Sequence, residues 1–184
     1  MIKLYGGTRS RASIVKWYLE ELQAPYEFQL LHMQIGQHLQ PEFLAINPFG
    51  KVPAITDGDF QLWESGAILL YLADKYVQVK TLEERAIASQ WVLFANATLG
   101  PGLFGEENRE KEMPRLLSGL NKILESQSYI TGDNFTVSDV AVAAILGYAI
   151  LFIKISYEEY PAIDAYMRRI SDRPAYKKGI LGIA

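Results

Sequence analysis

Residues 47–65 decide the fold, and they read Asn47-Pro48-Phe49-Gly50-Lys51-Val52-Pro53-Ala54-Ile55, then a short turn, then Trp63-Glu64-Ser65. The two prolines and the glycine at the start of this stretch exclude a regular helix. Residues 52–56 and 60–62 favour strands, and Asp57-Gly58 between them is typical of a hairpin turn. A proline at the head of a strand has no N–H to share. We therefore expect Val52 to keep its own N–H and C=O free to hold an extended peptide.

A helix is expected to follow at residues 64–76, where apolar residues recur with helical spacing. Ser65 then lies at the helix N-terminus, where free N–H groups and the helix dipole attract an anion such as a peptide carboxylate. A serine in this position is often only a helix cap. The adjacent Val52-Pro53 element favours a ligand site instead.

The order of predicted elements divides the chain in two. Strands at 2–5 and 26–31, helices at 13–22, 41–45 and 64–76, and the hairpin at 52–62 form an α/β unit with a crossover. From residue 83 onward we expect only helices, at 83–99, 110–126, 138–151, 161–171 and 174–179. Gly100-Pro101-Gly102 is expected to end the first of these. The predicted domains are residues 1–77 and 83–184.

Thr136-Val137-Ser138-Asp139 precedes an apolar run and is typical of a helix N-cap. Asp139 takes the position that Glu or Gln usually holds in a capping box. We expect this motif to stabilise a helix and assign it no chemistry.

Composition excludes several functions. The chain has 184 residues, a net charge of −3 and 49% hydrophobic residues, so nucleic acid is not an expected partner. No apolar run approaches a membrane span, and the N-terminus enters a strand without a signal peptide, so we expect a cytoplasmic location. With no cysteine, the protein has no thiol of its own, and any reactive sulfur must come from a ligand. No metal site is expected, because His32 has no suitable second ligand.

Five motifs together resemble the glutathione S-transferase family across nearly the whole chain. They are residues 47–65, Leu4-Tyr5, Ser10-Arg11-Ala12, the Thr136–Asp139 motif and Arg173-Pro174-Ala175-Tyr176. The likeness is to cytosolic members with a serine-type catalytic loop, including bacterial and cyanobacterial ones, although the C-terminal domain is short for the family. It implies a thioredoxin-like domain followed by an all-α domain, and a homodimer. It also implies glutathione as a co-substrate, without a permanent cofactor.

The same resemblance assigns a glutathione site. It implies that Pro53 is cis, that Val52 pairs with the cysteinyl unit of glutathione, and that Glu64 and Ser65 bind the peptide. In this family a basic residue near His38 often meets the glycine carboxylate, and Lys51 is a second candidate for that contact. The activity implied is conjugation of the glutathione thiolate to small hydrophobic electrophiles in detoxification. The alternatives are a glutathione-dependent peroxidase and a non-catalytic protein that binds glutathione or hydrophobic ligands.

Activation of the thiol is assigned to the loop before the first helix. A free thiol has a pKa of about 8.5, and lowering it by about two units requires roughly 2.7 kcal/mol. One hydrogen bond to a charged sulfur contributes about 1.5–3 kcal/mol, so one hydroxyl at a helix start is enough. Ser10 aligns best with the catalytic serine of the family, Arg11 is the first alternative and Thr8 the second. Ser10 can also be read as a simple N-cap.

The second substrate is expected between the two domains, where clefts favour ligands. Its candidate walls are Ile35, Asn96, Leu99 and Phe104. Leu and Phe at such positions are more often plain core residues.

Overall fold

The structure is a computed structural model that describes residues 1–76, 78–107 and 109–183. It divides the chain into two compact units, Met1–Tyr76 with Pro174–Ala184, and Val77–Arg173. The chain passes from the first unit to the second after Tyr76, and the sequence places the end of the first domain at residue 77. The C-terminal segment differs from the expected range 83–184, because from Pro174 onward it groups with the first unit.

The first unit is built around a four-stranded sheet in the order β2-β1-β3-β4. Its strands are β1 (Ile2–Gly6), β2 (Tyr26–Leu30), β3 (Ala54–Asp57) and β4 (Phe60–Trp63). Strand β1 runs parallel to β2 and antiparallel to β3, and Gly58 has the positive φ of 62° that the tight β3–β4 turn requires. This mixed sheet confirms the predicted thioredoxin-like arrangement.

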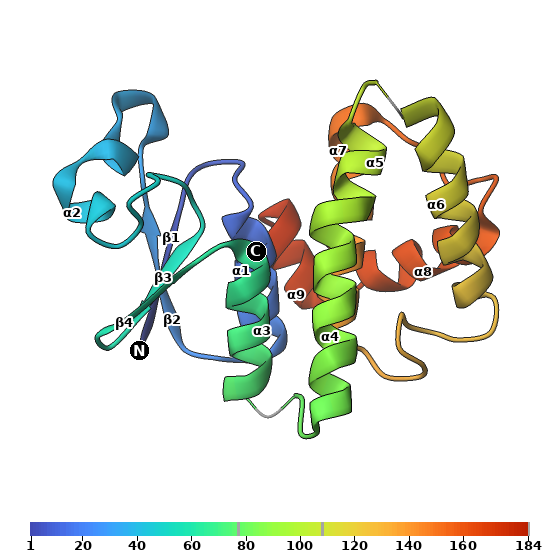
Figure 1. The fold of residues 1–184 in the computed structure, drawn as a ribbon, viewed down its shortest axis with the longest axis horizontal. Coiled ribbons are helices and arrows are strands. Elements are labelled where there is room, and N and C mark those ends of the chain that lie inside the picture. Colours follow the sequence, from blue (N-terminus) through green and yellow to red (C-terminus); the bar gives the residue numbers. More distant parts are fainter. Residues whose placement is uncertain (77, 108, 184) are drawn as a thin grey trace. The chain divides into compact units, whose positions relative to one another are not determined.

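Helices cover both faces of this sheet. Helices α1 (Ala12–Glu21) and α3 (Ser65–Lys75) lie on one side, and α2 (Pro41–Leu44) lies on the other (Figure 1). Two short 3₁₀ turns, η1 (Met33–Ile35) and η2 (Gln37–Leu39), lead into α2. The core on the α1 and α3 side is formed by fully buried apolar side chains, among them Leu4, Trp17, Ile55 and Leu69.

The C-terminal segment packs on α1. It consists of α9 (Pro174–Tyr176) and the π-helical turn η4 (Lys177–Leu181). The rings of Trp17 and Tyr176 meet edge to face with centroids 4.9 Å apart. Lys178 Nζ donates to Glu20 Oε2 at 2.8 Å, so both an apolar and a charged contact hold the segment to α1.

The second unit is helical throughout its described elements. These are α4 (Leu82–Phe94), the π-helical turn η3 (Ala95–Leu99), α5 (Gly100–Phe104), α6 (Arg109–Leu124), α7 (Val137–Ile153) and α8 (Pro161–Ser171). None of the helices in the described part of the chain combines the length and apolarity that crossing a membrane requires. The prediction of an all-α second part is confirmed.

The prediction that Gly100-Pro101-Gly102 ends the first helix of this unit is wrong. The helical path continues through η3 into α5 and ends at Gly105, whose N–H donates to Pro101 O at 2.8 Å. Pro101 lies in the first turn of α5, where a missing N–H costs little. The wider π-helical turn η3 comes directly before α5, so a new first turn begins at Gly100 and can hold the proline.

The capping box at the start of α7 is confirmed and extends further than predicted. Asp139 Oδ2 accepts from Thr136 N at 2.8 Å, and Oδ1 accepts from Ile130 N at 2.8 Å and from Tyr166 Oη at 3.1 Å. The carboxyl is completely buried, and burial raises its pKa against the opposing effect of these hydrogen bonds. Asp139 therefore joins α7 to α8 and to the segment before α7.

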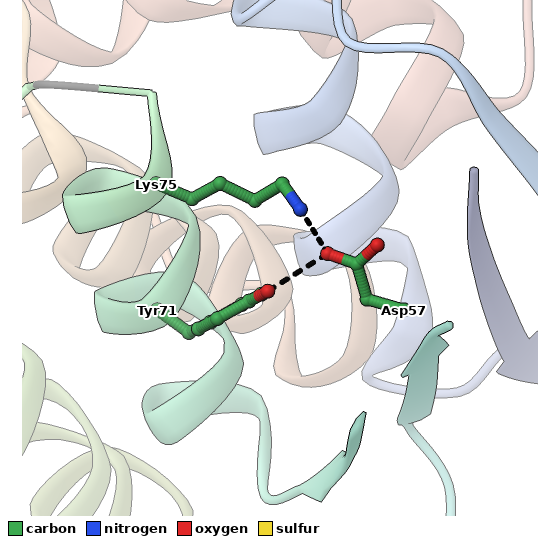
Figure 2. A network of polar contacts seen from close by, with 3 residues as sticks. All are labelled: Asp57, Tyr71 and Lys75. Carbon is green, nitrogen blue, oxygen red and sulfur yellow. Dashed lines mark hydrogen bonds and ion pairs between the residues drawn. The ribbon is translucent and has the colours of Figure 1, made fainter. Parts of the chain in front are cut away.

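In the first unit, a polar network ties the β3–β4 hairpin to α3 (Figure 2). Asp57 Oδ2 accepts from Tyr71 Oη at 2.7 Å and forms an ion pair with Lys75 Nζ. The hydrogen bond from Lys75, followed by that from Tyr71, lowers the pKa of Asp57. Because α3 starts at Ser65, this network helps to fix the helix that carries a candidate site residue.

Replacing Asp57 by asparagine should remove a pH-dependent contribution to stability. A carboxyl with a lowered folded-state pKa stabilises the fold above its unfolded pKa of about 3.9, and this contribution is lost as the pH falls through the folded-state value. Lys75 is 36% exposed, so solvent screening limits the loss in Asp57→Asn to about 1 kcal/mol at pH 7. Urea unfolding between pH 7 and pH 3 should show the two proteins converging in stability at acid pH. The exposed neighbour Asp59 provides the control, since Asp59→Asn should leave the curve unchanged.

Candidate functional site

The loop before β3 is organised by Asn47, which the sequence analysis did not single out. Asn47 is 2% exposed, its Nδ2 donates to Lys51 O at 2.7 Å, and its Oδ1 accepts from Phe49 N at 3.1 Å. The Gly50 N–H donates to Asn47 O at 2.9 Å, and Gly50 has a φ of 59°. The only sequence signal for this role is the Asn-Pro pair ahead of a glycine, which marks a turn but not its buried side-chain bonds.

The peptide bond between Val52 and Pro53 is cis, as the resemblance implied. Strand β3 begins two residues later, at Ala54, so Val52 lies outside the sheet ladder. Within residues 1–76, 78–107 and 109–183, no hydrogen bond involves the backbone of Val52. Its N–H and C=O are thus available to pair with an extended peptide.

The N-terminus of α3 follows on the same unit. Ser65 is its first residue and is 3% exposed, and the first helical bond runs from Ile68 N to Glu64 O at 3.0 Å. The N–H groups of residues 65–67 therefore have no partner inside the helix, which makes this end suited to an anion. Glu64 is exposed and has a φ of 71°, a backbone conformation that is uncommon for a non-glycine residue.

Ser10 lies in the turn between β1 and α1, two residues before the helix starts. Its Oγ accepts from Gly7 N at 3.1 Å and from Ala12 N at 3.3 Å. A hydroxyl oxygen has two lone pairs, so these two bonds leave the O–H as the part of the group that can still bind a ligand. Ser10 therefore caps the turn, and its O–H proton is not used by either of these two bonds.

Arg11 and Thr8, the alternatives to Ser10, are both exposed. Arg11 occupies the N-cap position of α1 and makes no side-chain capping bond. Both residues lie on the same turn as Ser10, so the structure brings all three candidates together.

His38 and Lys51 also belong to neighbouring segments. His38 is half-buried in η2, and its Nδ1 is buried with no hydrogen-bond partner in the described part of the chain. A Cβ placed on Gly50 would lie 2.9 Å from the carbonyl oxygen of His38, so η2 runs directly beside the residue that precedes Lys51. The Lys51 side chain is exposed.

The four residues expected around the second substrate are divided between the units. Ile35 ends η1 in the first unit and is 72% exposed. In the second unit, Leu99 is fully buried, as core residues are, and Phe104 is half-buried. Asn96 is half-buried and its Nδ2 donates to Val92 O at 2.9 Å.

No group of three or more His, Asp or Glu residues suited to a metal ion occurs among the residues that the structure describes.

Two sequence profiles match the chain. The glutathione S-transferase N-terminal domain matches residues 1–74, and the glutathione S-transferase C-terminal domain matches residues 105–174. The chain belongs to the glutathione S-transferase family. The fold predicted from the family resemblance is therefore confirmed.

Individual relatives match nearly the whole chain. The chain is 32% identical over 206 residues to the disulfide-bond oxidoreductase YfcG of Escherichia coli K12, covering 98% of this chain and 95% of that protein. It is 32% identical over 205 residues to glutathione S-transferase GstB of the same bacterium, covering 98% of each. A glutathione transferase family member from Pseudomonas fluorescens, crystallised with two glutathione molecules bound, superposes with a TM-score of 0.84 and 30% identity over 97% of this chain and 91% of its own.

Proposed function

We propose that this protein is a glutathione transferase that joins the thiolate of glutathione to small hydrophobic electrophiles. The observation that carries the proposal is the free backbone of Val52 beside cis-Pro53, on the same unit as the open N-terminus of α3. A peptide can pair with the first of these and place a carboxylate at the second. The relatives named glutathione S-transferase and the glutathione-bound structure support this assignment.

In the proposed site, each residue has one task. Val52 pairs with the cysteinyl unit, Pro53 shapes the turn, and Ser65 and the α3 N–H groups hold a carboxylate, with Glu64 beside them. His38 and Lys51 bind the carboxylate at the glycine end. The Ser10 hydroxyl donates to the sulfur, which favours the thiolate over the thiol.

The thiolate then attacks the electrophilic carbon of the second substrate, and a new C–S bond forms. In a displacement, the leaving group departs with its electron pair, and in an addition, the carbanion formed takes a proton from water. We propose that Asn96 and Phe104 of the second unit contact this substrate, Asn96 through its amide and Phe104 through its ring, while the buried Leu99 supports them from the core. Ile35 is a separate, exposed candidate on the first unit.

Ser65→Ala should weaken glutathione binding by about 1–2 kcal/mol, which is roughly 5- to 30-fold in the dissociation constant. The carboxylate loses its hydroxyl donor but keeps the backbone N–H groups of α3, which limits the loss. Isothermal titration with glutathione measures the effect. Ser89→Ala, on α4 in the second unit, is the matched control and should bind as the wild type does. Equal affinity in Ser65→Ala and the wild type would contradict the role of Ser65.

A second activity, glutathione-dependent disulfide reduction, is favoured by the relative YfcG, which is named a disulfide-bond oxidoreductase. Because this chain has no cysteine, a bound glutathione thiolate would itself attack the disulfide. That attack yields a mixed disulfide and releases one thiolate, and a second glutathione then resolves the mixed disulfide to oxidised glutathione. Parallel rate measurements with a chlorodinitrobenzene-type electrophile, a hydroperoxide and hydroxyethyl disulfide distinguish transferase, peroxidase and reductase activity. Glutathione binding without turnover of any of them would support the carrier alternative.

We further propose a homodimer with a cytoplasmic role in detoxification, as the family resemblance implies. A closed two-fold dimer is the commonest oligomer of soluble proteins. Multi-angle light scattering at micromolar concentration should give twice the chain mass of 20.8 kDa. A stable monomer would reject this proposal without affecting the glutathione site.

A further inference from the structure

The first unit contains a cavity that none of the proposed glutathione-binding residues lines. It has a volume of about 460 Å³ and lies between the ends of β1 and β2 and the segment that carries η2 and α2. Its lining residues are Tyr5, Leu30, Leu31, Gln37, Gln40, Glu42, Phe43 and Ile46. The volume falls within the range of roughly 300–1,000 Å³ typical of small-molecule sites.

Tyr5 gives this cavity an aromatic wall. Alternate residues of a strand point to opposite faces of the sheet, so Leu4 is fully buried while Tyr5 is half-buried on the α2 side. The ring of Tyr5 lies against that of Phe43, with centroids 5.8 Å apart and planes tilted by 50°.

The polar side chains that line the cavity are either negatively charged or uncharged. Glu42 is exposed in the first turn of α2, and Gln37 and Gln40 add side-chain amides. No Lys, Arg or His is among the described residues that line the cavity. Two aromatic rings and a carboxylate beside an apolar floor favour a cation that also has an apolar body.

We infer that this cavity binds small aromatic cations, at a site separate from that of glutathione. Leu31 and Ile46 would contact the apolar body, the adjoining rings of Tyr5 and Phe43 would form one wall beside it, and the ammonium group would face Glu42. Glutathione itself does not fit this chemistry, because its two carboxylates and one ammonium give it a net negative charge at neutral pH.

Three naphthalene derivatives that differ only in charge provide the test. These are 1-naphthylmethylamine as the cation, 1-naphthylmethanol as the neutral compound and 1-naphthaleneacetic acid as the anion, each titrated in a calorimeter with S-hexylglutathione present. The S-hexylglutathione occupies the proposed glutathione site, so that the naphthalene ligands cannot bind there. The amine should bind about 2- to 5-fold more tightly than the alcohol, and the acid most weakly.

Variants then locate the binding. Glu42→Gln should bring the amine and the alcohol to equal affinity, while Glu27→Gln, an exposed carboxylate on β2 outside the cavity, should leave their difference intact. Tyr5→Leu should weaken both ligands by about fivefold, because it removes the ring and keeps apolar volume. Equal affinity of the three ligands for the wild type, or a charge preference that survives Glu42→Gln, overturns the inference. Neither result bears on glutathione binding, which Ser65→Ala tests separately.

Discussion

Ser10→Ala should raise the pKa of the thiol of bound glutathione by about one to two units, because the thiolate loses one hydrogen bond to a hydroxyl. At neutral pH, where little thiolate would then remain, kcat/KM should fall about 10- to 100-fold. The ultraviolet absorbance of the thiolate, titrated with pH in the glutathione complex, measures the pKa directly. The midpoint of the pH–rate profile should move upward by the same amount.

Ser10→Ala removes both the proposed donor to the sulfur and the oxygen that caps the turn, so the controls must separate these two losses. The Ser10 oxygen also accepts from Gly7 N and Ala12 N, and losing this cap should lower stability by about 1 kcal/mol. Ser10→Thr keeps both the acceptor and the donor and should restore the pKa and most of the rate. Glutathione affinity should change less than the rate, since the loss falls on the ionised sulfur.

Arg11→Ala decides between the two candidate groups. If the thiol pKa rises more in Arg11→Ala than in Ser10→Ala, the guanidinium is the group that stabilises the sulfur anion. A titration curve that is identical in Ser10→Ala and the wild type would reduce Ser10 to a helix cap.

Local sequence signals predicted the elements of the first unit well. The helix expected at 13–22 is α1 (Ala12–Glu21), and the strand expected at 26–31 is β2 (Tyr26–Leu30), because apolar periodicity dominates both segments. The loop around Val52-Pro53 was predictable from proline chemistry and the family resemblance together. Its roles in binding stay predictions until the variants are measured.

What sequence reasoning missed depends on contacts between distant residues. Asn47 holds its loop through buried side-chain bonds that no local pattern encodes. Pro101 was expected to end a helix, but it lies in the first turn of α5, directly after the π-helical turn η3.

The place of the C-terminal segment is a further case, and it gives the strongest expected effect on stability. Gly179 lies in η4 and is buried against α1, where a Cβ would come within 2.6 Å of the Trp17 nitrogen and closer still to its Cα. These are backbone atoms of a packed helix, so they cannot move aside as the end of a flexible side chain would. The sequence shows only a glycine near the chain end, and the constraint arises from residues more than 150 positions apart.

Gly179→Ala should therefore destabilise the first unit by about 3 kcal/mol, the upper part of the range for overpacking. Thermal unfolding and urea titration of the purified variant measure the loss, and glutathione affinity should fall at temperatures where the first unit begins to unfold. Gly119→Ala is the matched control. Gly119 is exposed inside α6 and a Cβ there would meet no atom within 4 Å, so alanine should stabilise the helix by about 0.5–1 kcal/mol. If Gly179→Ala lowers the free energy of unfolding while Gly119→Ala raises it, the packing of the C-terminal segment on α1 stabilises the first unit. Helix α1 directly follows the turn that carries Ser10. Two equally mild effects would show that η4 can lift away from α1 at little cost.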